Sequence, residues 1–167
     1  MSEAEKLFGE KNFNKKIYRP IFNGDRPKII NTPNLDGAFA SLSTGAKTDW
    51  VSTFYELAHE TVHLLDPVTG FTNYLEEGFA VMFSLDMLKI HLNDNQFPQC
   101  SFYQKAWQLV NRLDGYPFPD CNPYDAAKLI RYKFGSLGEV EISGMFEIFP
   151  RVPKDIIQKL CDECNFT

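Results

Sequence analysis

The sequence predicts an α+β fold in which a small amino-terminal β-sheet is followed by a mainly helical carboxyl half. Two short β-prone runs come first along the chain and apolar residues at helical spacing follow them, an order that favours α+β layering over alternating βαβ units. The 167 residues contain no internal repeat and no linker rich in Gly or Ser. We therefore expect one domain spanning residues 1–167.

The amino-terminal segments predict an arm and two strands. Residues 1–16 alternate charged and polar groups, which indicates a short helix or a frayed arm. Residues 28–32 form a brief β-prone run that is closed by Pro33, and residues 38–43 alternate loosely between two glycines. Both runs predict strands of the small sheet.

A helix is predicted to begin at Thr48 and Asp49, because both suit a helix cap and first turn. Its apolar residues recur at spacings of three and four: Trp50, Phe54, Leu57, Ala58, Val62 and Leu65. This stripe has the period of an amphipathic helix. Pro67 and Gly70 are expected to end it.

The next predicted helix covers residues 73–92 and is apolar nearly all round, as expected of a helix buried in the middle of a domain. Further helices are predicted over residues 101–113, 124–134 and 153–164. A proline-rich loop at residues 116–123 separates two of them.

The composition argues against several classes of protein. The formal net charge is −5, which disfavours nucleic acid as a main partner because phosphate binding requires a basic surface. No run of 18 apolar residues exists, so no membrane span is expected. Residues 1–16 lack the apolar run of a secretory signal, and we expect a cytoplasmic protein. The oligomeric state has no signal in the sequence.

The chain has four cysteines, Cys100, Cys121, Cys161 and Cys164. Cys161 and Cys164 form a C-x-x-C pair. A zinc site with four thiolates would also need Cys100 and Cys121, which are not spaced as a zinc knuckle. Free thiols are the default in a cytoplasmic chain, and we expect them here, with a loose disulfide as the alternative.

The strongest chemical signal is the pattern His59-Glu60-Thr61-Val62-His63. Two histidines four residues apart lie on one face of a helix, so both imidazoles can bind a single zinc ion at about 2.0–2.1 Å. Glu60 lies close to that face and can take a proton from a zinc-bound water. The pattern falls within a predicted helix and uses two of the three histidines in the chain.

A catalytic zinc ion needs a third protein ligand and an open fourth position. The candidates downstream are Asp66, Glu76, Glu77 and His91. Asp66 precedes a proline at the helix end and is expected to cap that turn. His91 lies near the far end of its helix, where we expect it to be exposed.

Glu76 and Glu77 compete for the ligand position. If Asn73 is the N-cap, Glu76 falls where a capping-box glutamate belongs and has a structural role. Glu77 is turned about 100° away, toward a face where a buried carboxylate would be costly without a cation. This favours Glu77, with Glu76 as the alternative.

Residues 55–63 (YELAHETVH) and 75–80 (LEEGFA) together resemble the gluzincin zinc metallopeptidases, most closely the aminopeptidase N-like branch of the peptidase MA-like superfamily. The resemblance implies a zincin-like fold in a minimal single-domain form, with the small sheet over the active-site helix. It also implies that Glu77 binds the zinc ion. The gap of 13 residues between His63 and Glu77 suits such a minimal version.

Two fainter resemblances concern substrate binding. Residues 36–41 are similar to the substrate-lining edge strand of these enzymes, but they lack the glutamate that binds a free amino terminus in aminopeptidases. Residues 124–132 are similar to a later helix whose leading tyrosine stabilises the oxyanion. That similarity implies this role for Tyr124, helped by Arg131 or Tyr132. Packing of Tyr124 beside the proline-rich loop is the alternative.

Motif and resemblance together predict a zinc metallopeptidase that hydrolyses a peptide or protein substrate. His59, His63 and Glu77 are expected to bind Zn²⁺, with Glu60 as general base and Tyr124 at the oxyanion. One alternative is a non-catalytic zinc-binding regulatory or sensor domain that retains the fold. Another is an interaction domain without metal. A protein side chain in the fourth zinc position would favour the regulatory domain.

Overall fold

The computed structural model describes residues 1–164, which form four strands, one short 3-10 helix and seven α-helices. The predicted α+β class is therefore confirmed. In chain order the elements are α1 (Ser2–Phe8), β1 (Lys16–Ile17), β2 (Ile21–Phe22), β3 (Lys28–Asn31), β4 (Gly37–Leu42), η1 (Gly45–Thr48), α2 (Trp50–His63), α3 (Tyr74–Leu92), α4 (Ser101–Asn111), α5 (Pro123–Phe134), α6 (Ile142–Ile148) and α7 (Lys154–Cys161).

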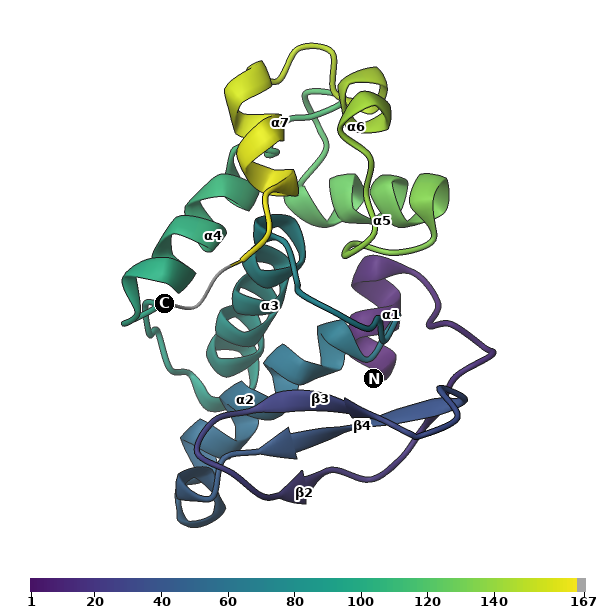
Figure 1. Ribbon diagram of the computed structural model, residues 1–167. Helices are drawn as coiled ribbons and strands as arrows, with labels where there is room; N and C mark the ends of the chain where they lie inside the picture. The colour runs from purple at the N-terminus through teal and green to yellow at the C-terminus, as the bar shows by residue number, and fades with distance from the viewer. Residues whose placement is uncertain (165–167) are drawn as a thin grey trace.

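Strand β4 is the centre of the small sheet (Figure 1). Strand β3 pairs with it antiparallel, whereas β1 and β2 pair with it in parallel. Lys16 lies opposite Gly37 and Ile21 lies opposite Ser41, so the register shifts by one residue between β1 and β2. These two short strands therefore form one interrupted edge strand with a bulge, which contains Pro20.

The sheet packs on α2 through a small apolar cluster of buried residues that includes Ala40, Leu42 and Leu64. Glu56 of α2 reinforces this contact, because its carboxylate accepts hydrogen bonds from the Ser43 backbone N–H at 2.8 Å and from the Ser43 hydroxyl at 2.6 Å. The helix that carries the histidine pattern is thereby fixed against the end of β4.

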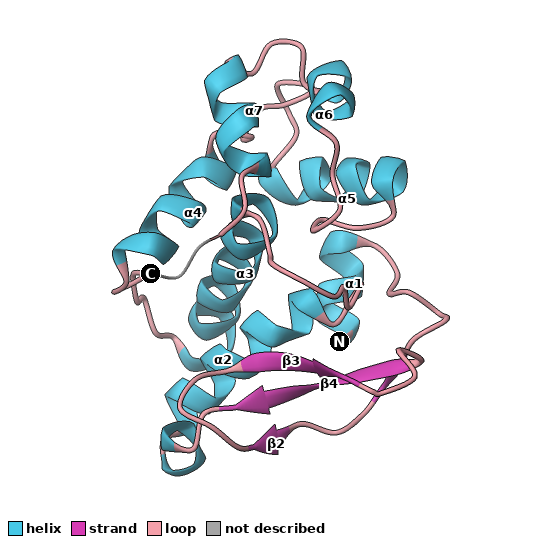
Figure 2. Ribbon diagram, in the orientation of Figure 1, coloured by secondary structure: helices cyan, strands magenta, loops and turns pink. Residues whose placement is uncertain are grey.

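Helix α3 runs through the middle of the molecule, with α2 and the sheet on one side and α5 to α7 on the other (Figure 1). Twelve of its 19 residues are buried, as its all-round apolar sequence predicted. The predicted start of α2 is confirmed, with Asp49 as the N-cap that accepts a hydrogen bond from Val51 N, and the predicted Asn73 cap of α3 accepts one from Glu76 N. Figure 2 shows that much more of the chain is helical than forms strands.

Gly78 of α3 allows α4 to approach at backbone distance. A Cβ atom at this position would lie 2.5 Å from Val110 Cγ1 and 2.9 Å from the Ala106 carbonyl carbon, inside the contact distance of both. The helix crossing therefore requires glycine here. It also brings α4 close to the neighbouring residue Glu77.

We expect Gly78→Ala to lower the free energy of unfolding by about 2 kcal/mol, because overpacking outweighs the gain in helix propensity. Gly45→Ala is the matched control, since a Cβ there would meet only the Ser43 hydroxyl, at 4.0 Å. Urea denaturation of the two variants measures the difference. A Gly78→Ala protein as stable as the wild type would contradict the tight crossing.

Arg131 of α5 joins three segments that are distant in sequence. Its Nε lies 2.7 Å from Asp66 Oδ2, and its two terminal nitrogens donate to the carbonyls of Phe8, Gly9 and Glu10 at 2.7 Å. The guanidinium thus holds the end of α1 and the turn after α2 against α5. The ion pair is buried, since the Arg131 and Asp66 side chains are only 7% and 11% exposed.

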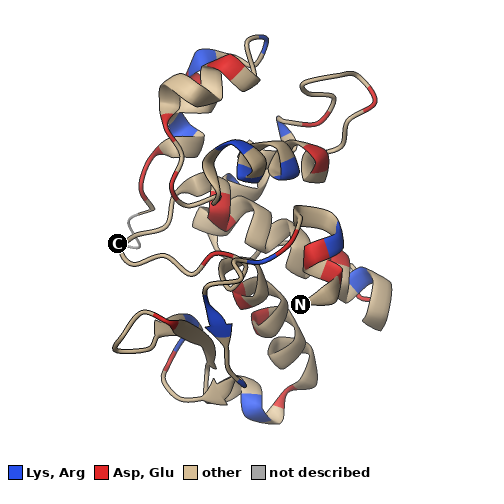
Figure 3. Cartoon of the chain, turned by 90° about the vertical axis from the view of Figure 1, so that its right-hand side faces the viewer, with Lys and Arg blue, Asp and Glu red and all other residues tan. Residues whose placement is uncertain are grey.

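Several elements differ from prediction. A short helix, α1, lies within residues 1–16 as predicted, whereas β1, β2, η1 and α6 were not predicted. Within the described residues no helix has the length and apolar character needed to cross a membrane. Seen from the side in Figure 3, charged residues of both signs are distributed over the helices and loops. Cys100, Cys121, Cys161 and Cys164 are free thiols, as expected.

Candidate metal centre

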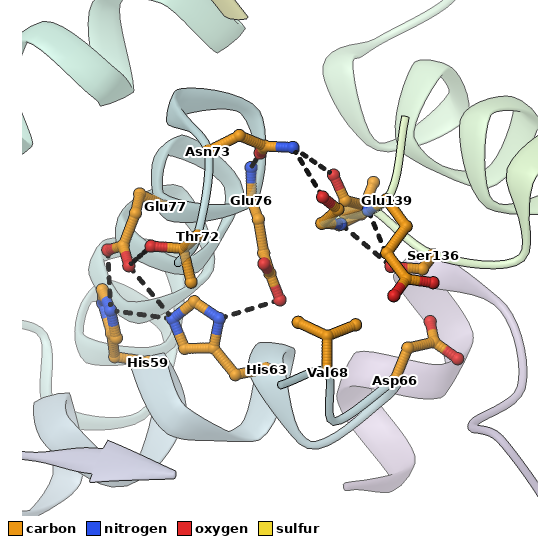
Figure 4. Close-up of polar contacts among 12 residues, drawn as sticks. His59, His63, Asp66, Val68, Thr72, Asn73, Glu76, Glu77, Ser136 and Glu139 are labelled. Atoms are coloured by element: carbon orange, nitrogen blue, oxygen red, sulfur yellow. Dashed lines mark hydrogen bonds and ion pairs between the residues drawn. The ribbon is translucent and has the colours of Figure 1, made fainter. Parts of the chain in front are cut away.

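Two helices that pack side by side bring the predicted metal ligands together (Figure 4). The end of α2 supplies His59, Glu60 and His63, and the first turn of α3 supplies Glu76 and Glu77. All five side chains are buried. The helical period of α2 places both histidines on the face toward α3, as the sequence predicted.

The ligand atoms of three residues converge on one point. His59 Nε2 lies 3.3 Å from His63 Nε2 and 3.3 Å from Glu77 Oε2, while Glu77 Oε1 lies 3.7 Å from His63 Nε2. A tetrahedral zinc ion with its usual bond lengths separates its ligand atoms by roughly 3.3–3.5 Å. The three side chains therefore lie close enough together to hold one metal ion.

Unsatisfied polar atoms gather at the same place. Of the five buried side-chain nitrogen and oxygen atoms without a hydrogen-bond partner in residues 1–164, four belong to His59, His63, Glu76 and Glu77. Two of them have a close neighbour outside hydrogen-bond geometry: His63 Nδ1 lies 3.0 Å from Glu76 Oε1, and Glu77 Oε2 lies 3.3 Å from His59 Nε2. Such atoms are costly unless a cation or proton compensates them, so the donor set fits a metal ion.

Glu76 has a different position from Glu77. Its backbone N–H binds the Asn73 cap, but its side chain does not return to Asn73 as a capping box would. Instead Glu76 Oε1 lies 3.0 Å from His63 Nδ1, on the side of the ring away from Glu77. A carboxylate on the second nitrogen of a histidine orients the ring for metal binding. The expected capping-box role of Glu76 is thus wrong, because the buried imidazole is the stronger partner.

The pKa values of the cluster shift in opposite directions. Burial alone would raise the pKa of Glu77, but the neighbouring His59 and His63 hold it below its ordinary value. Burial alone would lower the pKa of His63, but the carboxylates of Glu76 and Glu77 raise it. The pocket therefore favours positive charge among these carboxylates, which a metal ion would also supply.

Glu60 lies beside the three ligand residues in a cavity of about 680 Å³. Burial raises the pKa of its carboxyl, and the two histidines oppose this shift. A general base works best when its pKa approaches the working pH, so the direction suits proton transfer.

The opposite wall of this cavity comes from β3 and the turn before it. Arg26, Lys28 and Ile29 line it. Among the described strands β3 pairs only with β4, so its other edge is open, whereas both edges of β4 are paired. The expectation that residues 36–41 form the substrate-lining edge strand is therefore wrong. The alternation of side chains along a short strand predicts the strand itself, but it does not predict which strands pair with it.

Tyr124 does not line the cavity. Its hydroxyl donates to Asp86 Oδ2 at 2.5 Å, and its ring packs edge-on against Phe8. The proposed helpers are also elsewhere, since Arg131 is held by Asp66 and backbone carbonyls, and Tyr132 is 90% exposed. The predicted oxyanion role of these three residues is wrong because α5 packs against α1, away from the cavity.

Tyr103 of α4 is the tyrosine that does line the cavity. Its ring lies 5.4 Å from the His59 ring, and burial raises the pKa of its phenol, which keeps the hydroxyl protonated. No spacing in the sequence indicates this residue. It reaches the site only through the close α3–α4 crossing at Gly78, which is a tertiary feature.

The remaining candidates lie away from the ligand atoms. Asp66 is paired with Arg131, and the His91 ring packs on Phe54 at the other end of α3. Cys100 and Cys164 line the same cavity, but the potential metal group in the described part of the chain consists of His59, His63 and Glu77 alone.

Comparison of the chain with protein-family models, with curated proteins and with solved structures found no match. What the site can do must therefore follow from its own side chains and their geometry.

Proposed function

We propose that the chain is a zinc-dependent peptidase of the gluzincin type. His59, His63 and Glu77 would hold the zinc ion, and Glu60 would be the general base. The observation that supports this most strongly is that three side chains from two helices bring one ligand atom each to within 4.8 Å of one another, next to a buried glutamate. Bound zinc would polarise the scissile carbonyl and lower the pKa of a water toward about 7.

The protein's own groups then handle the proton and the developing charge. Glu60 takes the proton of the attacking water and returns it to the leaving amine. Its raised pKa favours the protonated carboxyl between these two transfers. The protonated Tyr103 phenol is the hydrogen-bond donor that we assign to the oxyanion, in place of Tyr124.

An extended peptide is the substrate that the cavity wall favours. The open edge of β3 offers backbone hydrogen bonds to an added strand. The finer fold assignment belongs to the same proposal: a small sheet lies along the helix that carries the histidine pattern, and a helical half follows, as in a zincin-like domain. No nucleic-acid partner is part of this proposal.

A non-catalytic zinc-binding regulatory domain is the second candidate. It is favoured by two thiols, Cys100 and Cys164, which line the cavity and could complete a structural zinc site. The three-residue ligand group and the buried Glu60 favour the catalytic alternative, because a structural site needs neither an open position nor a base.

Metal analysis tests the proposal directly. The purified chain, loaded with zinc and desalted, should contain one zinc ion per molecule. Chelator treatment should abolish peptide release from a denatured proteome, and one equivalent of zinc should restore it. A folded chain that binds no zinc at micromolar concentration would contradict the metal site. Stoichiometric zinc without any cleavage would favour the regulatory domain.

A further inference from the structure

Residues 162–164, which follow α7, lie against residues 72–74, at the start of α3. Cys164 N donates to the Thr72 carbonyl at 2.8 Å, Tyr74 N donates to the Asp162 carbonyl at 3.2 Å, and Asn73 forms an antiparallel bridge with Glu163. Helix α7 anchors this segment, since Ile157 and Leu160 are fully buried in the main core.

Thr72 connects this pairing to the metal centre. Its hydroxyl donates to Glu77 Oε1 at 2.8 Å (Figure 4). The other oxygen of that carboxylate, Oε2, lies 3.3 Å from His59 Nε2. The hydroxyl thus fixes the rotation of the Glu77 carboxylate. Thr72 itself lies before the cap residue Asn73, so the hydrogen bonds of α3 do not hold it in place.

The carboxyl-terminal segment lies at the same wall. Cys164 is only 2% exposed and lines the cavity together with Thr72 and Glu77. Its backbone N–H binds the Thr72 carbonyl and so holds Thr72 in place, and Thr72 in turn orients Glu77. The segment after α7 is about 90 residues beyond Thr72 in sequence, yet it is in contact with the metal centre.

We propose that Thr72 is a positioning residue for the ligand Glu77, and that residues 162–164 hold Thr72 in place. This inference rests on the proposed zinc site. Partners of ligand side chains typically contribute about 10- to 100-fold to metal affinity, because they remove the cost of orienting the ligand. The affinity of the site for zinc therefore depends on the carboxyl-terminal segment.

Thr72→Val keeps the shape of the side chain and removes the hydroxyl. We expect its Kd for zinc, measured by competition with a chromophoric chelator, to rise about 10-fold. Thr72→Ser restores the hydroxyl and should bind zinc as the wild type does. Equal affinity of Thr72→Val and the wild type would overturn the inference, as would equal weakness of the Val and Ser variants.

The role of the segment has its own pair of variants. Cys164→Pro and Cys164→Ala both remove the thiol that lines the cavity, but only the proline also removes the N–H that binds Thr72, so the proline variant should bind zinc more weakly than the alanine variant. Equal zinc affinity of the two would overturn this part. A wild-type chain that binds no zinc would overturn the proposed function itself, and this result requires no variant. Circular dichroism identifies any variant that fails to fold, and Thr72→Ala then replaces Thr72→Val.

Discussion

Replacement of Glu60 by glutamine is expected to leave one zinc ion bound per chain and to lower kcat for peptide hydrolysis by about 10²- to 10⁴-fold. Glutamine keeps the size of the side chain but cannot accept the proton of the attacking water. Because the three ligand atoms belong to other residues, the metal affinity should be close to that of the wild type. Metal analysis and a peptide-cleavage assay on the same sample measure both properties.

Two histidine variants serve as controls for the Glu60→Gln experiment. His63→Ala removes a ligand and should lose both zinc and activity. His91→Ala changes the third histidine, which packs on Phe54 away from the site, and should retain both. Turnover by Glu60→Gln at the wild-type rate would remove Glu60 from the mechanism. Proteomic identification of cleaved peptides, wild type against Glu60→Gln, then gives the sequence preference.

Arg131→Met is expected to lower the free energy of unfolding by about 3–5 kcal/mol, because breaking a buried ion pair leaves an uncompensated charge. Asp66 would lose its partner, and the carbonyls of Phe8, Gly9 and Glu10 would lose their donors. Urea denaturation with linear extrapolation measures the change.

Lys133→Met is the matched control on the same helix. Lys133 pairs with Glu147, whose side chain is 74% exposed, and such surface pairs contribute at most about 1 kcal/mol. Adding Asp66→Leu to Arg131→Met removes the orphaned charge and should recover part of the loss. If Arg131→Met were as stable as Lys133→Met, the contacts of Arg131 with Asp66 and the three carbonyls would not stabilise the fold.

The sequence predicted the parts of the site that depend on local spacing. The period of α2 places His59 and His63 on one face, and the Asn73 cap sets the register that separates Glu76 from Glu77. These features depend on 3.6 residues per turn and on a capping hydrogen bond, both of which can be inferred from a short segment.

The parts that depended on tertiary contacts were not predictable. Tyr124 was assigned to the oxyanion, but the direction of a helix in space is not encoded in its own period, and α5 turns this residue to Asp86. Tyr103 was overlooked for the same reason. Strands β1 and β2 have two residues each, too few for any alternation to be recognised.

The fold itself agreed with prediction where elements were long. The two long helices α2 and α3 appeared with the expected caps, whereas the seven-residue helix α6 did not stand out from its surroundings. A short helix has few apolar repeats and takes its stability from packing rather than from propensity.

The glycine at the α3–α4 crossing has a mechanical consequence. Because the two backbones touch at Gly78, α4 cannot move closer to α3, so the cavity cannot narrow from this side. The part of the wall at Gly70 and Phe71 is less constrained, because a Cβ atom on Gly70 would meet no atom within 4 Å and Phe71 is 72% exposed. In the proposed peptidase, a bulky substrate would therefore displace these two residues before it displaced α4.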